Sequence, residues 1–107
     1  MKSSFLGYWR IVEMEQWDLD YIDMESPGHI TFEKNGTGQL HFGGVDVGLD
    51  WSFDPRKAQA EFIFSGFDEG DEVSGRGWAK VKGANMAGGL AFHLGDKSGF
   101  SAAKVAT

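Results

Sequence analysis

Apolar and polar residues alternate along most of the chain in short runs, and turn-forming residues separate these runs. Ile30 and Phe32 alternate with polar neighbours, and so do Trp51 and Phe53. A period of two is typical of strands that bury one face. Glycine and proline recur at intervals of roughly ten residues, a spacing typical of all-β sandwiches and barrels. The pattern therefore predicts about eight strands in simple succession.

The predicted strands differ in how clearly their bounds are marked. They cover residues 6–14, 28–34, 39–42, a fourth run around 49–53, a fifth around 60–64, then 72–81, 90–94 and 100–105. The turn at residues 35–38, Asn-Gly-Thr-Gly, is the clearest hairpin signal, because Asn-Gly tolerates positive φ. Residues 44–48 are ambiguous, since they are also consistent with a bulge in one long bent strand.

These strands favour a closed barrel over a sandwich. An up-and-down sheet of eight strands leaves two exposed edges, and pairing the last strand with the first removes both. We therefore expect one all-β domain over residues 1–107, an eight-stranded antiparallel up-and-down barrel. A short helix is expected at residues 18–25, after the first strand, because Trp17 and Tyr21 would share one helical face and acidic residues suit its first turn.

Composition narrows the classes of function. The chain has no cysteine, which excludes disulfides and thiolate sites, and its net charge is −6. Ten basic residues scattered among sixteen acidic ones argue against nucleic-acid binding. The first 15 residues lack the apolar core of a signal peptide, and no apolar run approaches the roughly 18–20 residues of a membrane span. We expect a cytoplasmic, bacterial protein that contacts neither nucleic acid nor membrane.

In a simple meander, the connections after the first, third, fifth and seventh strands lie at one end of the barrel. That end collects twelve of the sixteen acidic residues: Glu13, Glu15, Asp18, Asp20, Asp23, Glu25, Asp46, Asp68, Glu69, Asp71, Glu72 and Asp96. The other end collects seven of the ten basic residues: Lys2, Lys34, Arg56, Lys57, Lys80, Lys82 and Lys104. A mouth with one sign of charge attracts cations or basic partners, although acidic loops also serve solubility alone.

The leading hypothesis is a non-enzymatic binding module with an acidic, aromatic mouth. Aromatic rings beside carboxylates suit an ammonium group, so the expected ligand is small and cationic or polar. The candidate mouth residues are Trp17, Asp18, Asp20, Tyr21, Asp68, His93 and Asp96. The alternative is a protein-interaction or self-associating barrel, a homodimer for example, whose core is filled by its own side chains and holds no ligand. Its acidic end or its wall would then dock a basic partner or a second copy.

Three further candidates depend on which face of the sixth strand points inward. If Arg76 and Trp78 point inward, Arg76 needs a carboxylate, and Glu13, on the same face as Trp9, is available; an anionic ligand is the other possibility. If they point outward, the small residues at positions 75, 77 and 79 face the core and make room for rings. The alternation alone does not decide between these arrangements.

Motifs for metals and catalysis are weak. The carboxylates at positions 18, 20, 23 and 25 lack the spacing and glycine bend of a calcium loop. The three histidines form no His-x-His or His-x-x-x-His pair, so zinc is not expected. No Gly-x-Ser-x-Gly motif is present, and a Glu13 acting as general acid or base is the remaining enzymatic alternative. We expect no cofactor.

Two resemblances extend this picture. Gly7-Tyr8-Trp9 resembles the Gly-x-Trp start of the calycin barrels (lipocalins, fatty-acid-binding proteins and avidins). That resemblance implies that Trp9 closes one end of a barrel, with Lys104 as the nearest substitute for the arginine that covers this tryptophan in lipocalins. The segments EMEQWDLDYIDME, GTGQLHFG, DEVSGRGWAKV and FHLGDKSGF are similar to a family of small uncharacterised bacterial β-barrel proteins. This second resemblance implies a self-contained domain and assigns no functional residue.

Overall fold

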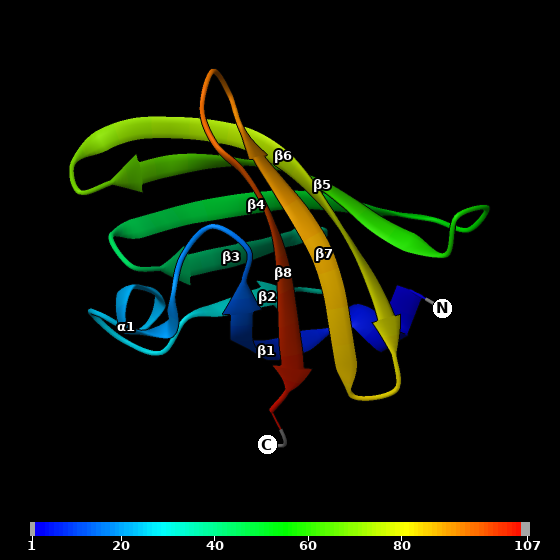
Figure 1. Cartoon of the computed structure of the whole chain (residues 1–107). Helices are drawn as coiled ribbons and strands as arrows, with labels where there is room; N and C mark the ends of the chain where they lie inside the picture. Colours follow the sequence, from blue (N-terminus) through cyan, green and yellow to red (C-terminus); the bar gives the residue numbers. More distant parts are fainter. Residues whose placement is uncertain (1, 106–107) are drawn as a thin grey trace.

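A computed structural model of the chain describes residues 2–105 and shows a closed barrel of eight antiparallel strands (Figure 1). Each strand pairs with its neighbours in sequence, and the last strand returns to pair with the first. The strands are β1 Gly7–Met14, β2 His29–Phe32, β3 Thr37–Phe42, β4 Val45–Asp54, β5 Gln59–Asp68, β6 Asp71–Lys82, β7 Asn85–Phe92 and β8 Lys97–Lys104. The predicted all-β, up-and-down barrel is confirmed.

Two helices of four residues flank β1, and they are η1 Lys2–Phe5 and α1 Leu19–Ile22. The short helix expected after the first strand is therefore present, although it is shorter than residues 18–25. Asp18 is its N-cap, and Asp23 follows its last residue as the C-cap. In the described part of the chain, no helix has the length and apolar character needed to cross a membrane.

The observed strand ends differ from the predicted ones mainly at turns. Residues 43–44 form a tight turn, with Phe42 of β3 opposite Val45 of β4, so the ambiguous junction is a hairpin and not one bent strand. Strand β7 ends at Phe92, and Leu94 lies in the next turn. The predicted strand over residues 90–94 therefore extends too far, because the chain leaves the sheet before Leu94.

A bulge in β1 changes which of its side chains point inward. Trp9 and Ile11 are buried, Val12 and Glu13 are both exposed, and Met14 is buried again. The register with β8 shifts between Ile11 and Glu13. The prediction that Glu13 shares the inward face of Trp9 is therefore wrong, because one extra residue turns Glu13 outward.

Aromatic rings fill the barrel from one end to the other. Successive ring centroids lie 5.0 to 6.5 Å apart along a continuous series: Phe53, Phe5, Phe32, Phe62, Phe64, Phe92, Phe42 and Trp17. Because each ring buries a large area, a chain of 107 residues can fill an eight-stranded barrel with its own side chains.

Strand β6 provides the space that two of these rings occupy. A Cβ atom at Gly75 would lie 2.6 Å from Cζ of Phe64, and one at Gly77 would lie 2.5 Å from Cζ of Phe62. Ala79 is fully buried on the same face. The small residues of β6 therefore point inward, beneath the rings of β5.

The outward face of β6 consequently carries Arg76 and Trp78, and both are exposed. The open question about this strand is settled in favour of the external arrangement. A buried ion pair between Arg76 and Glu13 does not form, because both residues lie on the outside of the barrel.

Helix η1 closes the end of the barrel that lies near the chain termini. Its buried residue is Phe5, whose carbonyl accepts a hydrogen bond from Nε1 of Trp9 at 2.9 Å. Nζ of Lys104 lies 4.9 Å from the centroid of the Trp9 ring and donates to the Leu6 carbonyl. Lys104 therefore covers Trp9 at this end of the barrel.

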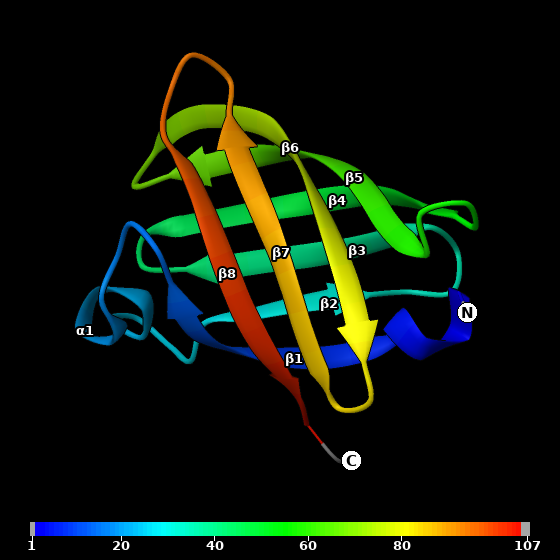
Figure 2. The ribbon, with the colours of Figure 1, turned by 45° about the vertical axis from the view of Figure 1, so that its right-hand side comes forward.

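The closed meander separates the connections into two groups at opposite ends (Figure 2). We call the end with the β1–β2, β3–β4, β5–β6 and β7–β8 connections the acidic end, because it carries the twelve acidic residues given above. The end with the β2–β3, β4–β5 and β6–β7 connections is the basic end, near which the seven basic residues lie. The fold thus gives the barrel opposite charges at its two ends.

Candidate functional site

A hollow of about 300 Å³ opens at the acidic end, beside the β5–β6 and β7–β8 turns. We call it the rim hollow, and its lining residues are Trp17, Val45, Asp68, Glu72, Val73, Ser74, Phe92, His93, Gly95 and Asp96. Three carboxylates, one imidazole and one indole therefore line a single space.

Main-chain hydrogen bonds hold the β7–β8 turn against β6 at this site. The Phe92 amide donates to the Asp96 carbonyl at 2.9 Å, and the His93 amide donates to the Ser74 carbonyl at 2.7 Å. Because these bonds involve only the main chain, the fold itself positions His93 and Asp96 at the edge of the hollow.

Trp17 reaches the hollow from the loop between β1 and α1. Its ring centroid lies 5.0 Å from that of Phe42 and 6.3 Å from that of Phe92. The amide of Gln16, the preceding residue, donates to Oγ of Ser98 at 3.2 Å. The indole of Trp17 is half-buried: it packs against these core rings and also lines the hollow.

Four residues predicted from the sequence meet in this hollow, namely Trp17, Asp68, His93 and Asp96. No family model, curated protein or solved structure matches this chain.

Glu72 and Ser74 also line the hollow but are not among the site residues predicted from the sequence. The alternation along β6 would identify them, because Glu72 and Ser74 lie just after the β5–β6 turn and, two residues apart, on the same face of the strand.

Three other predicted mouth residues lie outside the rim hollow. Asp18 accepts a hydrogen bond from the Tyr21 amide at 3.0 Å, so its carboxylate caps α1. The Tyr21 ring packs against Phe42 and lies over Gly43, where a Cβ atom would be 2.2 Å from the ring. Asp20 is exposed on α1. Asp18 and Tyr21 therefore fix helix α1 beside the barrel mouth, and none of the three residues lines the hollow.

A larger hollow lies on the outer wall of the barrel, across strands β4 to β8. It has a volume of about 1060 Å³ and continues into a second hollow of about 610 Å³. Together we call them the wall groove, which is characterised by the outward side chains of Asp50, Lys57, Glu61, Ile63, Arg76, Trp78 and Lys97. The predicted site residues Arg76 and Trp78 therefore lie together and do not line the rim hollow, although the groove borders it at Ser74, Phe92 and His93.

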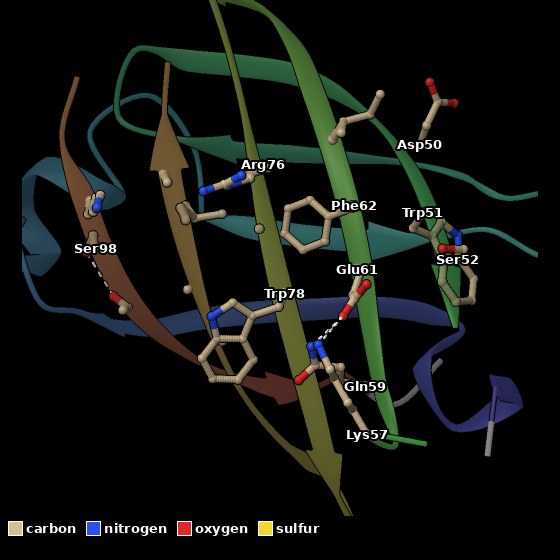
Figure 3. Close-up of a pocket in the computed structure, with 18 of the residues that line it drawn as sticks. Asp50, Trp51, Ser52, Lys57, Gln59, Glu61, Phe62, Arg76, Trp78 and Ser98 are labelled. Carbon is tan, nitrogen blue, oxygen red and sulfur yellow. Dashed lines mark hydrogen bonds and ion pairs between the residues drawn. The ribbon is translucent and has the colours of Figure 1, made fainter. Parts of the chain in front are cut away.

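Trp78 is an exposed aromatic residue of the wall groove (Figure 3). A Cβ atom at Gly89 would lie 2.7 Å from Nε1 of Trp78, so the indole rests on the neighbouring strand β7. Trp78 is nevertheless 41% exposed, and Ile63 on β5 is 62% exposed. Figure 3 shows Arg76 and Trp78 extending from β6 in the same direction. The groove thus combines exposed apolar groups with charges of both signs.

Asp23, which follows α1 at the acidic end, has a pKa clearly below its ordinary value. The Gly28 amide donates to Oδ1 of Asp23 at 2.9 Å, and Nη2 of Arg10 donates to Oδ2 at 2.5 Å. The hydrogen bond from Gly28, followed by that from Arg10, lowers the pKa of Asp23 below its ordinary value of 3.8. This carboxylate ties the end of α1 to β1, so its role is structural.

The histidines of β2 and β3 form a pair that sequence spacing does not reveal. His29 and His41 lie directly opposite each other, and their ring centroids are 5.6 Å apart. His29 also stacks on Tyr8, with centroids 4.8 Å apart. Within residues 2–105, no three histidine or carboxylate side chains gather closely enough to hold a metal ion.

Proposed function

We propose that this protein is a non-enzymatic binding module that takes a small organic cation into the rim hollow. The observation that carries this proposal is the convergence of Trp17, Asp68, Glu72 and Asp96 on one space of about 300 Å³. That volume is at the lower end of the range for small-molecule sites, about 300–1,000 Å³, and suits a compact ligand.

Electrostatics support a cationic ligand. The net charge is −6, and most acidic residues lie at the end where the hollow opens. Asp68 is half-buried, while Glu72 and Asp96 are exposed, so dissolved cations can reach all three carboxylates. A surface with one dominant sign of charge raises the local concentration of ions of the opposite sign.

The aromatic lining supports an organic cation over an inorganic one. Trp17 and Phe92 both line the hollow, and their ring planes are inclined at 77°. An alkylammonium group gains from contact with the face of an aromatic ring, and tryptophan gives the strongest such contact. The likeness of Gly7-x-Trp9 to the calycin start supports a binding role by analogy alone. The proposed position at the rim differs from an interior cavity, because the chain's own rings occupy the barrel.

An NMR chemical-shift titration with choline chloride tests the proposal, with tert-butanol as an uncharged control. We expect choline, but not tert-butanol, to shift the indole signal of Trp17 and the signals of His93. A carboxylate 4 Å from an ammonium contributes about 1 kcal/mol in bulk water and about 4 kcal/mol near a protein surface. The double variant Asp68→Asn with Asp96→Asn should therefore bind choline at least about tenfold more weakly than the wild type.

The matched control is Asp20→Asn with Asp71→Asn, which removes the same charge from the same end but outside the hollow. We expect this control to retain binding within about threefold, because only long-range charge is lost. Equal loss in both double variants would show that choline senses only the overall field. Identical shifts with choline and tert-butanol would show that the hollow does not select cations. Either result would overturn the proposal.

A further inference from the structure

The β7–β8 turn carries an apolar side chain that no residue in the described range covers. Leu94 is 95% exposed and has a φ of 57°. This left-handed region is disfavoured for residues that carry a Cβ atom, and leucine has no polar group to compensate. Figures 1 and 2 show the turn (orange) projecting beyond the neighbouring strands of the barrel. Leu94 is therefore presented to the surroundings as an apolar knob.

The wall groove contains exposed apolar side chains that an apolar residue such as leucine could contact. Besides Leu94 itself, its exposed large apolar residues are Trp78 and Ile63. The small residues Gly89, Ala91 and Gly99 also line it. Tryptophan side chains in such settings are frequent anchors of protein interfaces, with charged residues at the margin.

We propose that two copies of this chain associate through their walls, each inserting its β7–β8 turn into the wall groove of the other. Leu94 of one copy would contact Trp78 and Ile63 of the second copy. Leu94 itself lines one end of the wall groove, so the knob and the groove lie on the same wall. A single two-fold axis between them forms both contacts at once, and the pair closes without further growth.

The charge distribution fits this arrangement. A rotation that brings the β7–β8 turn onto the partner's groove also brings the acidic end of one copy toward the basic end of the other. Asp96 in the turn would approach Lys57, which lines the groove, and Lys80, which is exposed two residues beyond Trp78. The opposite orientation would place the two acidic ends together. Electrostatic complementarity therefore favours a second copy as the partner, in the orientation that places acidic ends beside basic ends.

Sedimentation velocity over a concentration series from about 1 μM to about 1 mM tests the association. We expect a monomer–dimer equilibrium that weakens between about 0.1 M and about 1 M NaCl, where the Debye length falls from about 10 to about 3 Å. The informative variant is Leu94→Gly, because glycine adopts a positive φ readily and the fold is retained. Losing two leucine contacts should raise the dimer dissociation constant about a hundredfold.

Met24→Ala is the matched control, since Met24 is also an exposed apolar residue but lies after α1, away from the groove. It should leave the dimer unchanged. A strict monomer over the whole series, or a dimer that Leu94→Gly does not weaken, would overturn the proposal.

A mixing experiment tests the reciprocal geometry itself. Leu94→Gly keeps Trp78 and Ile63 of the groove, and Trp78→Thr keeps Leu94, so a mixed pair retains one of the two contacts between Leu94 and Trp78. We expect the mixture to form a heterodimer about tenfold tighter than either variant alone forms a homodimer. No gain on mixing would show that Leu94 and Trp78 do not meet across the interface. Leu94 does not line the rim hollow, but His93 and Asp96 of the same turn do. The choline titration is therefore made at a protein concentration below the dimer dissociation constant, so that failure of either proposal is distinguished from failure of the other.

Discussion

The substitution Gly77→Ala tests directly which face of β6 points into the barrel. An alanine Cβ at this position would lie 2.5 Å from Cζ of Phe62 and 2.6 Å from the Gly89 carbonyl oxygen. Carbon atoms in favourable contact are about 3.5–4.0 Å apart, so the methyl group would overlap the ring by about 1 Å. Phe62 is only 4% exposed, and the carbonyl belongs to the main chain of β7. Neither neighbour can move without disturbing the core or the sheet.

The expected cost follows from two opposing effects. Overpacking a well-filled core typically costs about 1–3 kcal/mol. Alanine gains about 0.5–1 kcal/mol over glycine in a strand, because it loses less chain entropy on folding. The net loss is about 1–2 kcal/mol in the free energy of unfolding. For a domain of this size, that loss lowers the Tm by roughly 4–10 °C.

Gly48→Ala is the matched control, because Gly48 points outward from β4 and a Cβ atom at this position would have no other atom within 4 Å. It should leave the Tm unchanged or raise it slightly. Thermal and urea unfolding measure both variants, and equal urea m-values would show that the unfolded states are comparable. If Gly77→Ala is as stable as Gly48→Ala, the small face of β6 does not point inward. The outward placement of Arg76 and Trp78, and with it the wall groove, would then be refuted.

Two further substitutions test contacts that fix the ends of the barrel. Asp23→Asn should reduce stability at neutral pH and leave it equal to wild type at low pH. The lowered pKa of Asp23 stabilises the fold above its ordinary value of 3.8, and that contribution is lost as the pH falls through the folded-state pKa. Urea unfolding at several pH values measures this, and a constant difference between the two proteins would contradict it. Lys104→Met retains the aliphatic stem but removes the charge 4.9 Å from the Trp9 centroid. It should cost about 0.5–1 kcal/mol, and an unchanged Tm would show that this cation–π contact is not stabilising.

The barrel and its charged ends are predictable because both depend on strand order alone. Once each strand is antiparallel to the next, alternate connections lie at the same end, whatever the register. His93 and Asp96 belong to such a connection, Asp68 ends β5 just before another, and the structure brings all three to one hollow. Their meeting requires no knowledge of side-chain packing.

The errors arise where a position depends on packing or on one inserted residue. Strict alternation through β1 predicts Glu13 inside the barrel, and the bulge after Ile11 ends that alternation. The orientation of β6 cannot be decided from its own residues, since both faces are plausible. Only the pairing of Gly77 with Phe62, a cross-strand neighbour on β5, decides it. Leu94 continues an apolar pattern past the end of its strand.

Some glycines of the sheet are required by core packing, and others are not. Gly75 and Gly77 face rings that leave no room for a side chain, so the filled interior explains them. Gly48 and Gly99 face outward, and the nearest atom to a Cβ at Gly99 is a carbonyl oxygen 3.7 Å away. Glycine within a strand costs about 0.5–1 kcal/mol relative to alanine, and nothing in the interior offsets that cost at these two positions. Both line the wall groove, and a Cβ atom at either position would meet open space or only an ordinary contact. Core packing therefore does not account for these two glycines of the outer wall, and their position in the groove supports the wall-to-wall association proposed above.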